Sequence, residues 1–197
     1  ASTMETYGDQ EQKLPFKEDL PLKPLSPYAV AKVASDYYIR MAGKAFGLPY
    51  IISRACNTYG RKDNVGFIVE YIVTQMLKNE LIYIGSPHAI RDLMYVDDHV
   101  NAYVMALKSD IKNEVFNFST STATTMKELA EKIKEITGYQ KDIIFSFPPG
   151  YPSRPVVDPY LSLDASKAKI LLGWEPKVSL EEGLKKTIEY WKNKINM

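Results

Sequence analysis

The chain has 197 residues, 45% of them hydrophobic, and 25 basic and 24 acidic side chains give a formal net charge of +1. This is enough apolar material for one large domain or one and a half small ones. Without basic or acidic blocks, the sequence excludes nucleic acid and anionic membranes as expected partners. The single cysteine, Cys56, excludes an intramolecular disulfide. With no apolar run of membrane-spanning length, we expect a cytoplasmic protein.

Helices and strands alternate in the first third of the chain. A polar segment with three prolines predicts a loop over 9–24. Apolar spacing predicts a helix over 28–46, ended by Gly47, and the apolar run 50–54 predicts a strand. The polar segment 57–64 then follows the strand's carboxyl end, where open α/β sheets bind ligands.

The rest of the chain is more mixed. Helices are predicted over 67–77, from Asp97 or Asp98 as a cap to 107, from Thr124 or Thr125 to 137, over 166–172 and over 179–191. Strands or extended segments are predicted over 81–84, 91–96, 115–118 and 143–147. In the 67–77 helix, the expected buried residues are Phe67, Ile68, Tyr71, Ile72 and Met76. The order of elements predicts part of a parallel sheet followed by a smaller lobe.

The segment 26–32 places a phenol and an ammonium group on one helical face. Pro27 can open a helix because that position needs no N–H donor. Tyr28 and Lys32 are then one turn apart. A lysine at that position favours the phenolate form of a tyrosine and so suits it to proton transfer near neutral pH. Such a pair also occurs by chance, so its interpretation depends on accompanying motifs.

Several further motifs accompany this pair in a characteristic order. They are the segments 2–8, 54–60 and 91–98, then Arg154-Pro155 ten residues before 164–168, and finally 172–176. Together they resemble the extended short-chain dehydrogenase/reductase family, specifically its NAD-dependent nucleotide-sugar epimerases and dehydratases. The resemblance covers nearly the whole chain. It implies an α/β fold: the C-terminal part of a Rossmann-type doubly wound parallel sheet with a smaller α/β substrate-binding lobe.

One motif of that family is missing. The sequence contains no Gly-x-x-Gly-x-x-Gly turn, which binds the NAD pyrophosphate, and no acidic residue for the adenosine ribose. Because the chain also starts without an initiator methionine, we expect a carboxyl-terminal portion. The predicted domains are 1–62, the remainder of the NAD-binding domain, and 63–197, mostly the substrate lobe, interleaved with returning Rossmann elements near 91–120.

The resemblance implies roles for the catalytic and cofactor-binding residues. Tyr28 would take the proton from the sugar 4-hydroxyl as C4 gives hydride to NAD, and Lys32 would bind the nicotinamide ribose. Ala55 and Cys56 would lie against the nicotinamide, with Cys56 as packing rather than as a reactive thiolate. Thr3 would share a hydrogen bond with the substrate oxygen; the alternative is a strand-end hydroxyl bonded to backbone.

The resemblance also implies how a nucleotide-diphosphate sugar would be held. Arg91 and Arg154 match arginines that bind the diphosphate, a task that suits planar guanidinium groups. The alternative for Arg91 is a surface ion pair with Asp92 or Asp97. Asn57 matches an asparagine that hydrogen-bonds the diphosphate or the sugar.

Glu5 decides between reaction classes. A carboxylate can remove the C5 proton once C4 is a ketone, as water leaves C6; this implies a 4,6-dehydratase of the GDP-mannose 4,6-dehydratase type. Met4 departs from a second dehydratase branch, which carries an aspartic acid there. Two alternatives stay open, a UDP-glucose 4-epimerase-like enzyme and a non-catalytic nucleotide-sugar-binding fragment. In both of them Glu5 could be a solvated loop carboxylate.

Two further expectations concern metals and assembly. The histidines His88 and His99 lack the spacing of metal ligands, so no metal site is expected, and both are expected on loop or helix surfaces. In the family, the helices matching 28–46 and 67–78 form a four-helix bundle, which implies a homodimer.

Overall fold

The computed structural model describes residues 1–151 and 160–195. Its first sheet contains three parallel strands in the order β1 (Ser2–Thr3), β2 (Ile51–Ala55) and β6 (Glu114–Phe118). The register places Thr3 opposite Ala55, which in turn lies opposite Phe118. The amino-terminal segment is therefore fixed beside β2, the strand that ends at Ala55.

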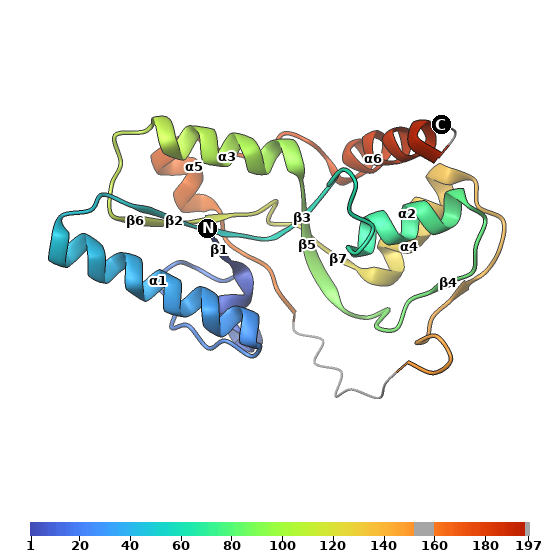
Figure 1. Cartoon of the computed structure of the whole chain (residues 1–197), viewed down its shortest axis with the longest axis horizontal. Helices are drawn as coiled ribbons and strands as arrows, with labels where there is room; N and C mark the ends of the chain where they lie inside the picture. Colours follow the sequence, from blue (N-terminus) through green and yellow to red (C-terminus); the bar gives the residue numbers. More distant parts are fainter. Residues whose placement is uncertain (152–159, 196–197) are drawn as a thin grey trace.

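Helices cover both faces of this sheet. Helix α1 (Pro27–Phe46) lies on one face, and α3 (Val96–Lys108) and α5 (Ser166–Leu172) lie on the other (Figure 1). This layering confirms the predicted Rossmann-like α/β class.

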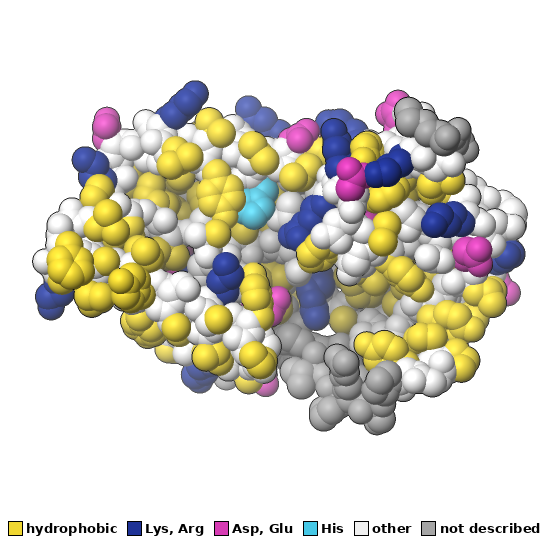
Figure 2. Space-filling model, in the orientation of Figure 1, with side chains coloured by type: hydrophobic (Ala, Val, Ile, Leu, Met, Phe, Trp, Pro, Cys, Tyr) yellow, Lys and Arg dark blue, Asp and Glu magenta, His cyan; other side chains and the backbone are white. Residues whose placement is uncertain are grey.

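Helix α1 has clear start and stop signals. The Ser26 side chain accepts a hydrogen bond from the Ala29 N–H at 3.1 Å, and Pro27 occupies the first turn. Gly47 ends the helix in the left-handed conformation with φ of 68°. The outward face is apolar: 60% of Tyr37 and 64% of Tyr38 is exposed. Figure 2 shows hydrophobic side chains gathered over this helix.

Two smaller sheets complete the strand pairing. Strand β5 (Ile90–Tyr95) pairs in parallel with β3 (Asn57–Tyr59) and antiparallel with β7 (Ala123–Thr125). Strand β4 (Ile82–Tyr83) pairs in parallel with β8 (Ile143–Ile144). Strand β7 was not predicted, and β8 is shorter than the expected 143–147.

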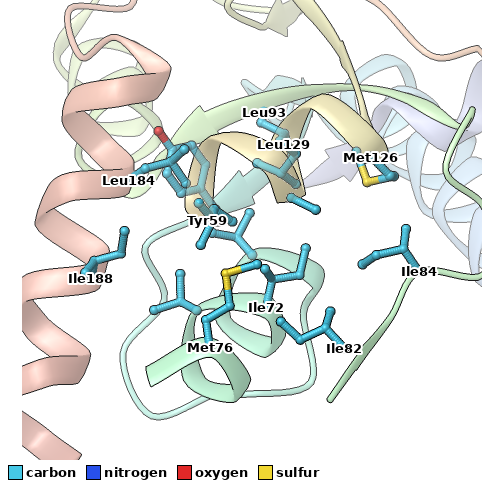
Figure 3. Packing of buried hydrophobic residues seen from close by; sticks show 14 of the residues in the cluster. Tyr59, Ile72, Met76, Ile82, Ile84, Leu93, Met126, Leu129, Leu184 and Ile188 are labelled. Carbon is cyan, nitrogen blue, oxygen red and sulfur yellow. The ribbon is translucent and has the colours of Figure 1, made fainter. Parts of the chain in front are cut away.

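Three helices pack together at the other end of the molecule. Helix α2 (Ile68–Leu77) contacts both α4 (Met126–Thr137) and α6 (Leu180–Ile195). Helix α4 begins with a capping box between Thr125 and Glu128. Apolar residues of these helices, with Tyr59 of β3 and Leu93 of β5, form a helical cluster whose packing is shown in Figure 3; its helical members include Ile72, Met76, Leu129, Leu184, Ile188 and Trp191.

A second apolar cluster lies around the first sheet. This sheet cluster includes Met4, Tyr7, Phe16, Ala55, Cys56, Met94, Phe116, Phe118, Leu163 and Trp174. Strand β5 contributes Leu93 to the helical cluster and Met94 to the sheet cluster. The division into domains at residue 62 stays a proposal. Any such division has to assign the segment around α5 to the same domain as the sheet cluster.

Two sequence expectations about helices are wrong. Helix α3 begins after Tyr95 without a side-chain cap, because both Asp98 carboxylate oxygens accept N–H groups from Lys177 and Val178 instead. In α2, Phe67 and Ile68 are partly exposed and the interior includes Glu70. Apolar spacing could not predict that Glu70 is buried, because its burial depends on a hydrogen bond. The Glu70 carboxylate accepts this bond from the Arg61 backbone N–H at 2.8 Å.

Candidate active site

Thr3 and Glu5 lie where the first strand turns into the 3-10 helix η1 (Met4–Tyr7). The Thr3 hydroxyl caps this helix by accepting the Glu5 N–H at 3.4 Å. This matches the backbone-bonding alternative for Thr3 but leaves its own O–H to donate. Gly8 ends the turn with φ of 65°, and a Cβ there would collide with the Lys23 carbonyl. The turn that carries Glu5 is therefore closely packed.

Tyr28 and Lys32 occupy the first two turns of α1, as predicted. Tyr28 is 52% exposed. The Lys32 Nζ lies 5.7 Å from the centroid of the Tyr28 ring and donates to the Ala1 carbonyl at 3.2 Å. The ammonium group therefore faces both the phenol ring and the start of β1, within one turn of helix.

Ala55, Cys56 and Asn57 follow one another at the carboxyl end of β2. Ala55 is 6% and Cys56 5% exposed. Burial, and then the nearby Asp92 carboxylate, raise the pKa of the Cys56 thiol well above its ordinary value. Cys56 is thus a packed thiol rather than a nucleophile. The Asn57 side-chain oxygen is buried without a hydrogen-bond partner within the described part of the chain.

Arg91 lies on β5, directly across from β7. Its Nη1 donates to the Ile90 carbonyl at 2.8 Å, and its backbone bridges Leu161. Asp92, proposed as one surface partner, is instead fully buried. It accepts hydrogen bonds from Ser119 and from the Thr120 hydroxyl at 2.5 Å. Burial raises the pKa of Asp92 despite these donors. The predicted Arg154 lies outside the described residues.

One cleft brings several of these residues together. It has a volume of about 260 Å³, and its lining includes Glu5, Asn57 and Arg91. Ser26, the cap of α1, and Ala29 in its first turn also line it, on either side of Tyr28 in the chain. Tyr28 and Lys32 are not part of the lining, nor are Thr3, Ala55 and Cys56. The cleft therefore unites the predicted carboxylate, amide and guanidinium groups next to the helix turn that carries the phenol.

Sequence reasoning missed some of the wall. Ser26 was visible as the residue before Pro27, and its capping role fixes it beside the cleft. Leu161 had no such signal, because only its backbone bridge to Arg91 brings it there.

The two histidines differ in their surroundings. His88 is exposed, as expected. His99, on α3, is partly buried: its Nδ1 lies 2.7 Å from the Thr58 hydroxyl, and its Nε2 is buried without a partner in the described structure. Burial, and then the charge of Arg61, lower the pKa of His99. Within residues 1–151 and 160–195, no group of three or more His, Cys, Asp or Glu side chains could hold a metal ion.

The described helices include none long and apolar enough to cross a lipid bilayer.

Comparison with known proteins places this geometry in context. A family model described as GDP-mannose 4,6 dehydratase matches residues 1–187. A Methanocaldococcus jannaschii protein provisionally named UDP-glucose 4-epimerase is 35% identical over 191 residues, which are 95% of this chain and 60% of the relative. The dTDP-glucose 4,6-dehydratase of Haemophilus influenzae is 29% identical over 203 residues, 96% of this chain and 59% of the relative.

Solved structures give the same two activities. The UDP-glucose 4-epimerase of Thermotoga maritima with UDP-glucose is 37% identical, with a TM-score of 0.91 over 98% of this chain and 62% of that one. The dTDP-glucose 4,6-dehydratase of Bacillus anthracis in complex with NAD is 29% identical, with a TM-score of 0.89 over 99% of this chain and 61% of that one. The chain thus spans about 60% of the length of these relatives.

Proposed function

Because this chain belongs to the GDP-mannose 4,6-dehydratase family, within the extended short-chain dehydrogenases/reductases, we propose that it is the substrate-binding and catalytic portion of an NAD-dependent nucleotide-sugar 4,6-dehydratase, a lyase. One observation carries the choice of reaction: Glu5 lines the same cleft as Asn57 and Arg91. A carboxylate within a substrate cleft is what elimination across C5–C6 requires.

Arg91 and Asn57 are the proposed binding groups for the nucleotide-diphosphate sugar. The Arg91 guanidinium suits diphosphate oxygens because its donors form a planar fork. The buried Asn57 oxygen needs a donor, since an unsatisfied buried acceptor is costly. A sugar hydroxyl or the nicotinamide amide would supply one. Arg154 is the second proposed diphosphate ligand.

Tyr28, Lys32 and Thr3 are the proposed groups for proton transfer at the sugar 4-hydroxyl. The Tyr28 oxygen takes the proton, and the Lys32 ammonium lies beside the phenol, 5.7 Å from the ring centroid. Thr3 donates its O–H to the same substrate oxygen, since its lone pair already accepts the Glu5 N–H. All three come from two adjacent elements, the end of β1 and the start of α1.

Glu5 is the proposed base for elimination. With C4 as a ketone, the carboxylate removes the C5 proton, the C5–H electrons form the C5–C6 double bond, and the C6–O bond breaks. Glu5, now protonated, gives the proton taken from C5 to the C6 oxygen as it leaves, so that the group departs as water and the carboxylate is restored. The cleft position of Glu5 supports this role over that of a solvated loop carboxylate.

The residues present fit one end of NAD. NAD, when bound, would supply a hydride acceptor for C4 and, once reduced, a hydride donor for C6. Lys32 would hold the nicotinamide ribose, and Ala55 and Cys56 would pack against the ring. The Asn57 oxygen beside them has no hydrogen-bond partner among the described residues, which supports a polar ligand group here. The Gly-rich pyrophosphate turn is absent from this sequence, so the proposed contribution of this chain is the nicotinamide end.

Two measurements test the proposal. Calorimetry with UDP-glucose, dTDP-glucose and GDP-mannose should detect binding by the chain, and Arg91→Met should abolish it. Incubation with NAD and the bound sugar nucleotide should then give a product that absorbs ultraviolet light in alkali, as a 4-keto sugar does. Failure of all three nucleotides to bind would refute the proposed substrate class. If the chain alone binds NAD, the non-catalytic reading is refuted.

A nucleotide-sugar 4-epimerase, an isomerase, is the second candidate. It is supported by the 35% and 37% identities to proteins named as UDP-glucose 4-epimerases. Met4, where a second dehydratase branch carries an aspartic acid, is 1% exposed in the sheet cluster and supplies no acid to the cleft. An epimerase would interconvert the C4 epimers and give no alkali-absorbing product.

We also propose a homodimer formed through helices 28–46 and 67–78. The supporting observation is the exposed apolar face of α1, where Val30 is 53% and Met41 45% exposed. A nucleotide-sugar enzyme with one buried thiol would act in the cytoplasm, where a lone cysteine stays reduced.

A further inference from the structure

A buried arginine connects the two elements that form the walls of the cleft. Arg54, near the end of β2, is 2% exposed and its partner Asp36 on α1 is 3% exposed. The Arg54 Nη2 lies 2.7 Å and the Nε 3.2 Å from the same Asp36 oxygen. The second Asp36 oxygen accepts from the Arg40 Nε at 2.6 Å. The aspartate is thus fixed from two sides.

The other arm of the guanidinium reaches η1. Its Nη1 donates to the Tyr7 hydroxyl at 3.0 Å and to the Glu18 carbonyl at 3.3 Å. Tyr7 in turn donates to the Asn117 side-chain oxygen at 2.8 Å. Burial raises the pKa of Tyr7 to about 12, so the phenol keeps the proton that it donates. The Tyr7 hydroxyl therefore has one defined acceptor role and one defined donor role.

The positions of these residues relate the network to the cleft. Asp36 lies one turn beyond Lys32 and two turns beyond Tyr28 on the same helix. Tyr7 ends the turn that begins with Thr3 and carries Glu5. Arg54 thus bonds simultaneously to the α1 wall and to the η1 wall.

Stability alone is a weak explanation for this arrangement. A buried ion pair gains little over well-packed apolar side chains, because both charges lose their hydration. What an apolar replacement could not supply is direction: the arginine fork fixes the angles of three donors at once. A network of this kind is suited to hold two elements at one spacing.

We propose that Asp36, Arg54 and Tyr7 are positioning residues that set the placement of α1 relative to η1, and so align the sugar end of the substrate. The inference rests on the proposed function, in which Glu5 and Tyr28 act on the sugar while Arg91 binds the diphosphate. Loss of the network disturbs the sugar end and leaves the diphosphate contacts in place, since Arg91 lies on β5, outside the network.

Tyr7→Phe is the sharpest test, because the ring keeps its contact with Phe16, with ring centroids 5.3 Å apart, and loses only the hydroxyl. The matched control is Tyr139→Phe, which removes a buried hydroxyl bonded to the Glu80 carbonyl at 2.5 Å in the helical cluster. Calorimetry compares the bound sugar nucleotide with its nucleoside diphosphate. Tyr7→Phe should lower the affinity for the sugar nucleotide about two- to tenfold and leave the affinity for the nucleoside diphosphate unchanged. The control should change neither.

The inference would be overturned if Tyr7→Phe lowered the affinity for both ligands equally, or if it changed neither affinity. Arg54→Lys, which keeps the charge and removes the fork, should reproduce the selective loss. If the wild-type chain binds no nucleotide sugar, the proposed function fails, and hydrogen exchange still decides the inference. In Tyr7→Phe, the amides of Gly8 and Lys23 and the first turns of α1 should exchange faster, with α4, which packs in the helical cluster, unchanged. Unchanged exchange in η1 and α1 would refute the positioning role.

Discussion

The Lys32 ammonium lies 5.7 Å from the centre of the Tyr28 ring, one helical turn away, and also donates to the Ala1 carbonyl at 3.2 Å. The first turns of α1 and the start of β1 are thus bonded through the same lysine. This contact joins the two segments that carry Tyr28, Thr3 and Glu5.

Tyr28→Phe should remove the proton acceptor and leave binding intact. We expect turnover of the nucleotide sugar to fall about 10²- to 10⁴-fold, the usual contribution of a general acid or base. The affinity measured by calorimetry should stay within twofold, because the diphosphate contacts are elsewhere. Tyr38→Phe, on the outer face of the same helix, is the control and should turn over normally. A Tyr28→Phe variant with wild-type turnover would exclude the phenol from the reaction.

Glu5→Gln should separate elimination from the rest of the reaction. We expect solvent deuterium incorporation at C5 and formation of the alkali-absorbing product to be lost together, since both need the carboxylate. Glu131→Gln, which alters a surface pair with Lys127 on α4, should be neutral. If Glu5→Gln keeps both activities, the dehydratase assignment is wrong.

His99 should make stability depend on pH. Its pKa is lowered in the folded protein, so the unfolded chain binds a proton first as the pH falls. The stabilising contribution is complete above about pH 6.5 and is lost as the pH falls through the folded pKa. Urea unfolding at pH 8 and pH 5 should show that the free energy of unfolding falls less at the lower pH in His99→Gln than in the wild type.

His88→Gln is the control for this measurement, because His88 is exposed. Asp92 and Glu70, whose pKa values burial raises, act in the opposite direction and are present in every variant. Equal pH dependence in His99→Gln and wild type would contradict the assigned role.

Tyr37→Glu combined with Tyr38→Glu should disrupt the proposed dimer. These side chains are 60% and 64% exposed in the chain, and buried charges without partners destabilise an apolar interface. Sedimentation should show a monomer. Leu107→Glu, at an 83% exposed position on α3, should leave the oligomeric state unchanged. A wild-type monomer at every concentration would refute the interface.

Local sequence signals predicted the elements that local chemistry determines. Pro27 at the start and Gly47 at the end predicted α1, and Thr124 or Thr125 was predicted at the start of α4, where Thr125 is the cap, because such signals act on neighbouring backbone groups. The position of Glu5 after β1 also followed from the motif in which it lies.

Distant contacts were beyond such signals. Asp98 was predicted as a possible cap, but its carboxylate binds backbone groups about 80 residues away. His99 was expected on a loop or helix surface, and it is partly buried because its ring contacts the Thr58 hydroxyl and stacks on Tyr103. In both cases a partner distant in sequence determines the side chain's environment, and the periodicity of a single segment carries no information about that partner.

The Asp98 contacts couple the unfolding of the two apolar clusters. Asp98 lies on α3 above the sheet cluster, while Lys177 and Val178 immediately precede α6, whose Leu184 and Trp191 belong to the helical cluster. The Asp98 carbonyl also accepts from the Trp174 indole at 3.2 Å. Unfolding either cluster therefore breaks bonds that anchor the other. The two halves should melt in one calorimetric transition, and Asp98→Ala should split it into two.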